Sequence, residues 1–226
     1  MQITKDNLDF LQQLKENNNR EWFNKNKALY QKNHEEVIAF AEALLLELNK
    51  HDQIETISGK KSLHRIYRDT RFSKDKTPYK ASWSGGFKRA TKQLRGGYFF
   101  KIETDKAWLA GGFWGPSSAD LKLIREAIAA DAEEFRSVIN SKEFKNYFGE
   151  LKGEAVKTAP KGYAKDHPQI DLLRMKQFLV VKEFPLKTVL SKDFHKKVNE
   201  GFQNMRPFFD VMSEFLTTDA NGEPLY

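Results

Sequence analysis

Basic side chains are concentrated in residues 60–95 of this 226-residue chain. Twelve of the 38 lysines and arginines lie there against two acidic residues, which gives the segment a charge of +10, while the other 190 residues sum to −3. Like charges held this close repel one another unless anions or neighbouring carboxylates neutralise them. The pattern therefore predicts an anion-binding surface.

Arginines and one aspartate alternate in the middle of this segment. If residues 63–72 form a strand, its two-residue period places Arg65, Asp69 and Arg71 on one face. Guanidinium groups that flank a carboxylate are suited to hold phosphate or carboxylate through paired hydrogen bonds. The alternative is an internal network in which a buried Asp69 pairs with Arg71 and ties strands to helices.

A second basic stretch lies at residues 157–176, where a polar loop leads into a helix. We expect Asp166 and Pro168 to begin that helix, whose free N–H groups and dipole would favour an anion. The candidate anion-binding residues from both stretches are Arg65, Arg68, Arg71, Lys76, Lys80, Arg174 and Lys176.

Two side chains in these stretches are weak candidates for proton transfer, Asp69 and His167. Neighbouring arginines lower the pKa of an aspartate, which suits ion pairing better than acid catalysis. A histidine beside a helix start commonly completes a local hydrogen bond instead. No Ser–His–Asp order is recognisable, so the sequence leaves open whether the chain is an enzyme.

Cofactor motifs are missing from the chain. It has no cysteine, and its five histidines form no close pair, so we predict no metal site from neighbouring ligands, and a site assembled from dispersed histidines and aspartates is left open. Neither of the common glycine-rich phosphate-binding patterns is present, and we predict no cofactor.

The expected partner is an anionic small molecule or a nucleotide. Aromatic residues interleave with the basic ones, which would also suit nonspecific binding of nucleic acid by base stacking. The same aromatics serve the core of a sheet, and no known nucleic-acid-binding signature is present. Nucleic-acid binding and a purely structural or interaction role are therefore the alternatives, and the oligomeric state is left open.

Hydrophobic spacing divides the chain into helical and extended parts. Residues 4–50 have helical spacing with a break at the asparagines 17–19, and residues 54–114 alternate as strands do. Helical patterns follow to the C-terminus, interrupted by strand candidates at 154–158 and 177–184. We predict an α+β fold in which N-terminal, middle and C-terminal helices pack on a mainly antiparallel meander.

Three glycine pairs stand in or beside the predicted strands, at residues 85–86, 96–97 and 111–112. Glycine weakens a strand unless a bulge or a close neighbour requires the missing side chain. We expect bulges or crowded packing at these pairs, with a backbone opening for a ligand as the alternative.

The chain has no pattern for export or membrane insertion. Its N-terminus lacks a basic region followed by an apolar stretch, and no run approaches the ~18 apolar residues that span a bilayer. We expect a cytoplasmic protein without a membrane partner, folded as a single domain over residues 1–226.

Four runs of residues resemble a known family, at 17–23, 65–80, 111–116 and 160–168. They are similar, in the same order, to the conserved hypothetical proteins called domain of unknown function 2461. The resemblance covers nearly the whole chain and implies a single-domain cytoplasmic protein. It implies no reaction.

Overall fold

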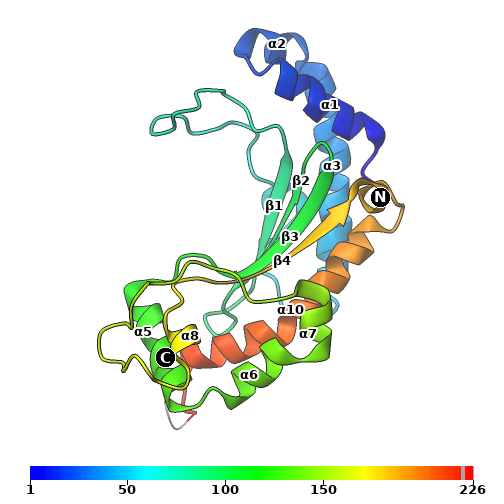
Figure 1. The fold of residues 1–226 in the computed structure, drawn as a ribbon. Helices are drawn as coiled ribbons and strands as arrows, with labels where there is room; N and C mark the ends of the chain where they lie inside the picture. Colours follow the sequence, from blue (N-terminus) through cyan, green and yellow to red (C-terminus); the bar gives the residue numbers. More distant parts are fainter. Residues whose placement is uncertain (220–221, 226) are drawn as a thin grey trace. The chain divides into compact units, whose positions relative to one another are not determined.

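The computed structural model describes residues 1–219 and 222–225 and has the predicted α+β fold (Figure 1). Its strands are β1 Trp83–Lys88, β2 Gly97–Ile102, β3 Lys106–Phe113 and β4 Phe178–Pro185. They form one antiparallel sheet in the order β1-β2-β3-β4, so the predicted meander is confirmed. The described helices are α1 Lys5–Glu16, α2 Arg20–Lys25, α3 Lys27–Leu48, α4 Gly59–Ser62, α5 Ser118–Ala130, α6 Glu133–Asn140, α7 Lys142–Phe148, α8 Ile170–Leu173, α9 Leu186–Val189 and α10 Phe194–Thr217.

By its internal contacts the chain divides into two compact units, each of which contains parts of the strands and of α10. The first comprises residues 1–87, 99–109 and 183–200, and the second comprises the rest. The count of one domain over residues 1–226 stays a prediction, and residues 220, 221 and 226 lie outside the described part of the chain.

The N-terminal helices of the first unit begin and end where their polar residues predict. Thr4 caps α1, and Asn19 caps α2 by accepting a hydrogen bond from the Trp22 backbone N–H at 2.9 Å. The predicted break at the asparagines 17–19 is therefore confirmed.

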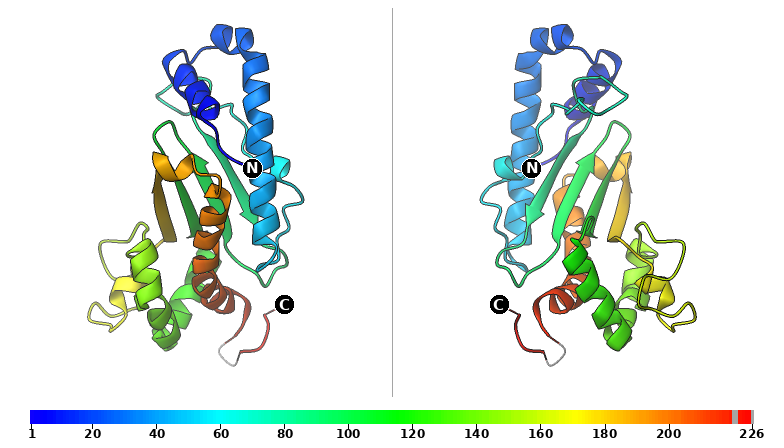
Figure 2. Two further views of the ribbon diagram at one scale, coloured as in Figure 1. Left: turned by 90° about the vertical axis from the view of Figure 1, so that its right-hand side faces the viewer. Right: turned by 90° about the vertical axis from the view of Figure 1, so that its left-hand side faces the viewer.

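Helix α3 covers one face of the sheet in the first unit (Figure 2). Phe40 of α3 lies 5.7 Å, between ring centroids, from Phe100 of β2, and both rings are buried. Because side chains alternate along a strand, Phe99 and Lys101 point to the opposite face. That second face is where the site described below is built.

The second unit has its own aromatic core. Tyr98 lies 4.7 Å from Phe202 and 5.0 Å from Phe209, between ring centroids. Phe135 of α6 packs between Phe178 and Phe208 at 6.4 and 6.1 Å. These buried rings hold the middle helices and the C-terminal part of α10 together.

The glycine pairs are sites of crowded packing, as expected. A Cβ atom on Gly85 would lie 2.8 Å from the Phe100 ring, and one on Gly111 would lie 2.4 Å from Sδ of Met205. Gly112 has a φ of +131°, and its Cβ would lie 2.1 Å from the carbonyl oxygen of Phe178. Only glycine fits at Gly112 without moving the neighbouring backbone.

Two of the strands expected within residues 54–114 are wrong, the one at 54–58 and the one at 63–72. Residues 54–58 and 63–72 form no strand, and α4 lies between them. Gly59 explains the difference, because its N–H donates to Oε2 of Glu42 at 2.6 Å and a Cβ there would lie 2.3 Å from the Glu42 backbone nitrogen. The chain is thereby held against α3, and after α4 it pairs with the sheet through a single bridge, between Leu63 and Gly85, instead of forming a strand.

Two further predictions in the second unit need correction. Residues 154–158 make a single bridge, between Ala155 and Met175, and not a strand. The helix expected to start at Asp166 starts four residues later as α8, preceded by Gln169. The described part of the chain contains no helix both long and apolar enough to cross a membrane.

Candidate anion-binding cleft

A cleft of about 650 Å³ lies in the first unit, on the face of the sheet opposite α3. It is lined by Lys15, Asn18, His64, Arg68, Asp75, Thr77, Tyr79, Lys80, Ala81, Ser82, Ser84, Phe99, Lys101 and Trp108. Strands β1, β2 and β3 supply its floor, and the segment between α4 and β1 supplies much of its wall.

Aromatic rings form the floor of the cleft. Phe99 of β2 and Trp108 of β3 lie 5.0 Å apart between ring centroids, and His64 lies 5.7 Å from Phe99. Phe99 and Trp108 are only half-buried, although apolar rings of this size favour full burial. The two ring planes are inclined to each other by 39°, and Nζ of Lys101 lies 5.7 Å from the centroid of the Trp108 ring, so the floor is aromatic but not flat.

Cationic side chains surround this floor. Lys101 is partly neutralised, since its Nζ lies 2.6 Å from Oε1 of Glu103. Among residues 1–219 and 222–225, Lys15 and Lys80 have no hydrogen-bond or ion-pair partner for their ammonium groups. These two lysines can thus bind an anion without breaking an existing contact.

Arg68 has a different role, because it holds the wall of the cleft together. Its guanidinium donates to Oδ2 of Asp75 and to the hydroxyl of Thr77. Asp75 also accepts hydrogen bonds from the backbone N–H and the hydroxyl of Thr77, both at 2.9 Å. These donors, led by the Thr77 N–H, lower the pKa of Asp75 to about 2, so the ion pair persists at neutral pH.

Asn18 anchors the other end of this wall. Its side-chain amide donates to the carbonyl of Tyr79 at 2.9 Å and accepts from the Tyr79 N–H at 3.0 Å. The Tyr79 ring also stacks on Phe23 of α2, with centroids 4.1 Å apart. The turn between α1 and α2 therefore fixes where the segment between α4 and β1 meets the cleft.

His64 is the imidazole inside the cleft. Its backbone N–H donates to the carbonyl of Ser84 at 2.9 Å, and its Nδ1 lies 3.2 Å from Oγ of the same serine. Partial burial, followed by the positive charge of Lys80, lowers the pKa of His64. His64 was not singled out from the sequence, because an isolated histidine among arginines has no motif.

We expect the pKa of His64 to rise when an anion binds the cleft, and also in Lys80→Gln, because both changes reduce the positive potential at the ring. Between the lowered pKa and the ordinary value of 6.5, the folded chain holds fewer protons at His64 than the unfolded chain. Its contribution to stability therefore falls as pH drops through that window. NMR titrations of the His64 ring check this, in wild type with and without phosphate and in Lys80→Gln. A pKa of His64 that changes neither with phosphate nor in Lys80→Gln would contradict it.

A family comparison can now be added to this geometry. The model of the conserved hypothetical protein family DUF2461 matches residues 6–211. The chain belongs to this family. No curated protein matches it, and no solved structure matches it.

The structure brings only part of the predicted site to the cleft. Arg68 and Lys80 line the cleft, whereas Arg65, Arg71 and Lys76 are exposed outside it. Lys76 donates to the backbone carbonyl of Thr70 at 2.9 Å and so stabilises the loop.

The expectation of a buried Asp69 is wrong in this DUF2461 chain. Asp69 is paired with Arg71 at 2.7 Å, but its side chain is 58% exposed. Hydrogen bonds from Arg71 lower the pKa of Asp69, which makes it a poor acid. The reason for the difference is that residues 63–72 form no strand in the sheet, and Asp69 lies in a part of this segment that projects into solvent.

The second basic stretch is engaged in local contacts within the second unit. Nε of Arg174 donates to the carbonyl of Val156 at 2.8 Å, and Lys176 pairs with Glu154 at 2.8 Å. Nδ1 of His167 accepts a hydrogen bond from the backbone N–H of Gln169 at 3.1 Å. His167 thus completes a local hydrogen bond, which is the alternative to proton transfer that the sequence offered for it.

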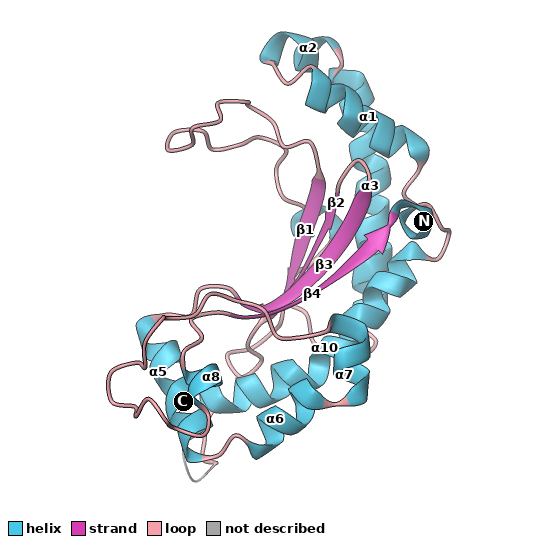
Figure 3. Ribbon diagram, in the orientation of Figure 1, coloured by secondary structure: helices cyan, strands magenta, loops and turns pink. Residues whose placement is uncertain are grey.

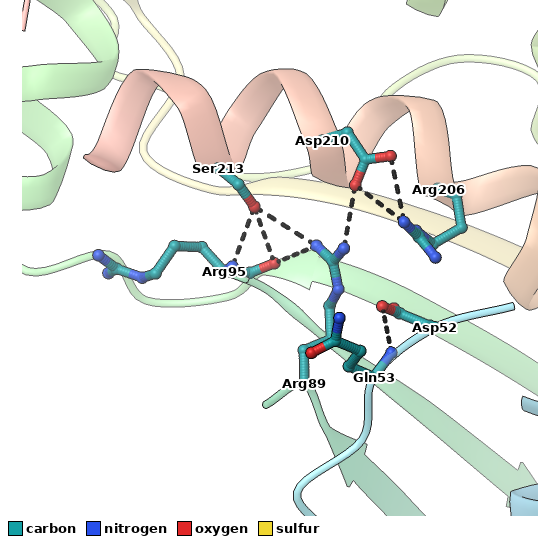
Figure 4. A network of polar contacts seen from close by, with 7 residues as sticks. All are labelled: Asp52, Gln53, Arg89, Arg95, Arg206, Asp210 and Ser213. Atoms are coloured by element: carbon teal, nitrogen blue, oxygen red, sulfur yellow. Dashed lines mark hydrogen bonds and ion pairs between the residues drawn. The ribbon is translucent and has the colours of Figure 1, made fainter. Parts of the chain in front are cut away.

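A buried arginine does exist in the basic segment, but at Arg89 (Figure 4). The Arg89 side chain is 0% exposed, and its guanidinium donates to Oδ1 of Asp210 at 3.0 Å and to the carbonyl of Arg95 at 2.9 Å. Ser213 accepts from the Arg95 N–H at 2.9 Å and so joins the network. The sequence does not distinguish Arg89 from its exposed neighbours.

Acidic and histidine side chains do not gather into a metal site in the described ranges 1–219 and 222–225, where no group of three or more could hold a metal ion. The cleft itself contains one acid, Asp75, and one histidine, His64. Its chemistry is therefore cationic and aromatic.

Proposed function

We propose that the cleft binds a small anionic molecule that carries a flat ring, and that a nucleotide is the ligand class that fits best. The observation that carries this proposal is the combination of two lysines without partners, Lys15 and Lys80, with the half-buried rings of Phe99 and Trp108. Lysine ammonium groups bind phosphate, and aromatic rings bind bases by stacking.

The size and lining of the cleft support the same ligand class. A volume of about 650 Å³ lies within the range of small-molecule sites. Hydroxyl groups of Ser82 and Ser84 add neutral polar groups that could orient a sugar or a base edge. If the ligand is turned over, His64 beside Ser84 is the group placed to exchange a proton.

The proposal predicts that Trp108→Ala weakens binding of adenosine monophosphate by roughly tenfold and leaves the weaker binding of inorganic phosphate unchanged. Base stacking contributes about 1–3 kcal/mol per base, whereas phosphate binding depends on the lysines. Isothermal titration calorimetry on both ligands measures the difference. Trp114→Ala is the matched control, because Trp114 is 66% exposed and does not line the cleft.

Two results would contradict the proposal. If no nucleotide or phosphate binds the wild-type chain at low salt, the cleft is not an anion site. If Trp108→Ala weakens phosphate and adenosine monophosphate equally, the aromatic floor does not contact a ring.

A further inference from the structure

We propose that the loop of residues 67–79 extends the cleft into a binding site for single-stranded nucleic acid, with Phe72 stacking on a base beyond the cleft. The inference rests on the proposed function, since the cleft would hold one nucleotide of the strand. Figure 3 shows the loop leading away from the sheet between α4 and β1.

The base of this loop is held by paired backbone contacts. The N–H of Arg68 donates to the carbonyl of Pro78 at 2.9 Å, and the N–H of Lys80 donates to the carbonyl of Ile66 at 2.7 Å. Tyr67 and Tyr79 form an antiparallel bridge between these bonds. The loop is thus a projecting hairpin-like arm with a defined base.

The tip of the loop presents an aromatic ring to solvent. Phe72 is 96% exposed, although burying such a side chain is worth roughly 1.5–3 kcal/mol. The guanidinium carbon of Arg71 lies 5.9 Å from the centroid of the Phe72 ring. An exposed ring beside a cation is the arrangement with which proteins stack on bases of a single strand and neutralise its phosphates.

Basic side chains outnumber acidic ones between the cleft and the tip, although Arg68 and Arg71 are each paired with an aspartate. Arg68 belongs both to the arm and to the lining of the cleft, and Lys80, which directly follows the arm, also lines the cleft. Residues 65–80 contain six basic side chains and two acidic ones. A phosphate backbone could therefore follow one basic path from the cleft to Phe72.

A single strand fits these features better than a membrane surface does. An anionic bilayer could contact Phe72 and the basic side chains at the tip. It could not use Phe99 and Trp108, which lie half-buried on the floor of the cleft. A flexible strand with unstacked bases can reach both aromatic positions, whereas a duplex keeps its bases stacked and paired.

Fluorescence anisotropy with a labelled twelve-residue oligothymidylate tests the inference. We expect Phe72→Ala to weaken binding of the oligonucleotide roughly tenfold and to leave the affinity for thymidine monophosphate unchanged. Ile57→Ala is the matched control, because Ile57 is also exposed, at 82%, and lies outside the arm. Equal affinity of wild type and Phe72→Ala for the oligonucleotide would overturn the inference.

Phe72→Leu separates stacking from membrane insertion. Leucine is apolar but has no aromatic face, so we expect it to lose oligonucleotide affinity as alanine does. If the oligonucleotide does not bind while vesicles containing phosphatidylserine bind wild type and Phe72→Leu alike, the arm contacts membranes and the inference is overturned. If the oligonucleotide binds and its binding requires Phe72, the role of the arm in binding a single strand is supported. If in that case no mononucleotide binds, the proposed function of the cleft is overturned.

Discussion

Replacing Arg89 by alanine is expected to lower the free energy of unfolding by roughly 3–5 kcal/mol. The variant removes a fully buried side chain and its charged hydrogen bonds to Asp210 and to the carbonyl of Arg95. It also removes the contact of the guanidinium with the ring of Phe209, whose centroid lies 5.4 Å away. For a chain of this length the melting temperature should fall by about 6–20 °C.

Arg71→Ala is the matched control for this experiment. Arg71 also pairs with an aspartate, but both side chains of that pair are exposed, and exposed ion pairs contribute about 0–1 kcal/mol. Thermal unfolding followed by circular dichroism compares the two variants. A loss of stability in Arg71→Ala as large as that in Arg89→Ala would contradict the assignment of the structural role to Arg89.

Replacing Lys15 and Lys80 together by glutamine is expected to weaken nucleotide binding by about 100-fold. Each lysine is a donor to phosphate, and a loss of tenfold for each corresponds to about 1.4 kcal/mol, near the lower end of hydrogen bonds to charged groups. Stability should change little, because neither ammonium group has a hydrogen-bond or ion-pair partner in the described residues.

Calorimetry measures this loss. All variants are compared at one ionic strength, because salt weakens the interactions of exposed charges. Lys192→Gln removes one exposed lysine that does not line the cleft, and it is the control for the single variants Lys15→Gln and Lys80→Gln, which change the net charge by the same amount. Equal weakening in Lys192→Gln would show that the ligand responds to the general charge of the chain. If the double variant binds the nucleotide as tightly as wild type does, Lys15 and Lys80 do not contact the ligand.

The sequence predicted the class of fold because that depends on local patterns. Helical spacing at residues 4–50 and the asparagine break at 17–19 reflect which side chains can be buried and which can cap a helix. Alternation likewise indicated the strands that became β1, β2 and β3. The predicted glycine crowding held at Gly112, although its neighbour Phe178 could not be named from the sequence.

The lining of the cleft was predicted only in part, because charge alone does not show where a side chain points. The +10 segment contains Arg68 and Lys80, which line the cleft. It also included Arg89, which is buried, and Arg71, which is exposed on the loop. All four are basic residues within 22 positions of the chain, and their spacing does not show which of them line the cleft, which is buried and which is exposed.

The sequence by itself determined that this chain is an α+β protein of the DUF2461 family with one strongly basic segment. Only the tertiary structure decided that this segment meets Phe99, Trp108 and Lys15 in a cleft. Those contacts join residues far apart in the chain, and they depend on how Gly59 and Asn18 fix the path of the backbone. Local propensity acts over a few residues, whereas the cleft depends on contacts made only when the whole unit packs.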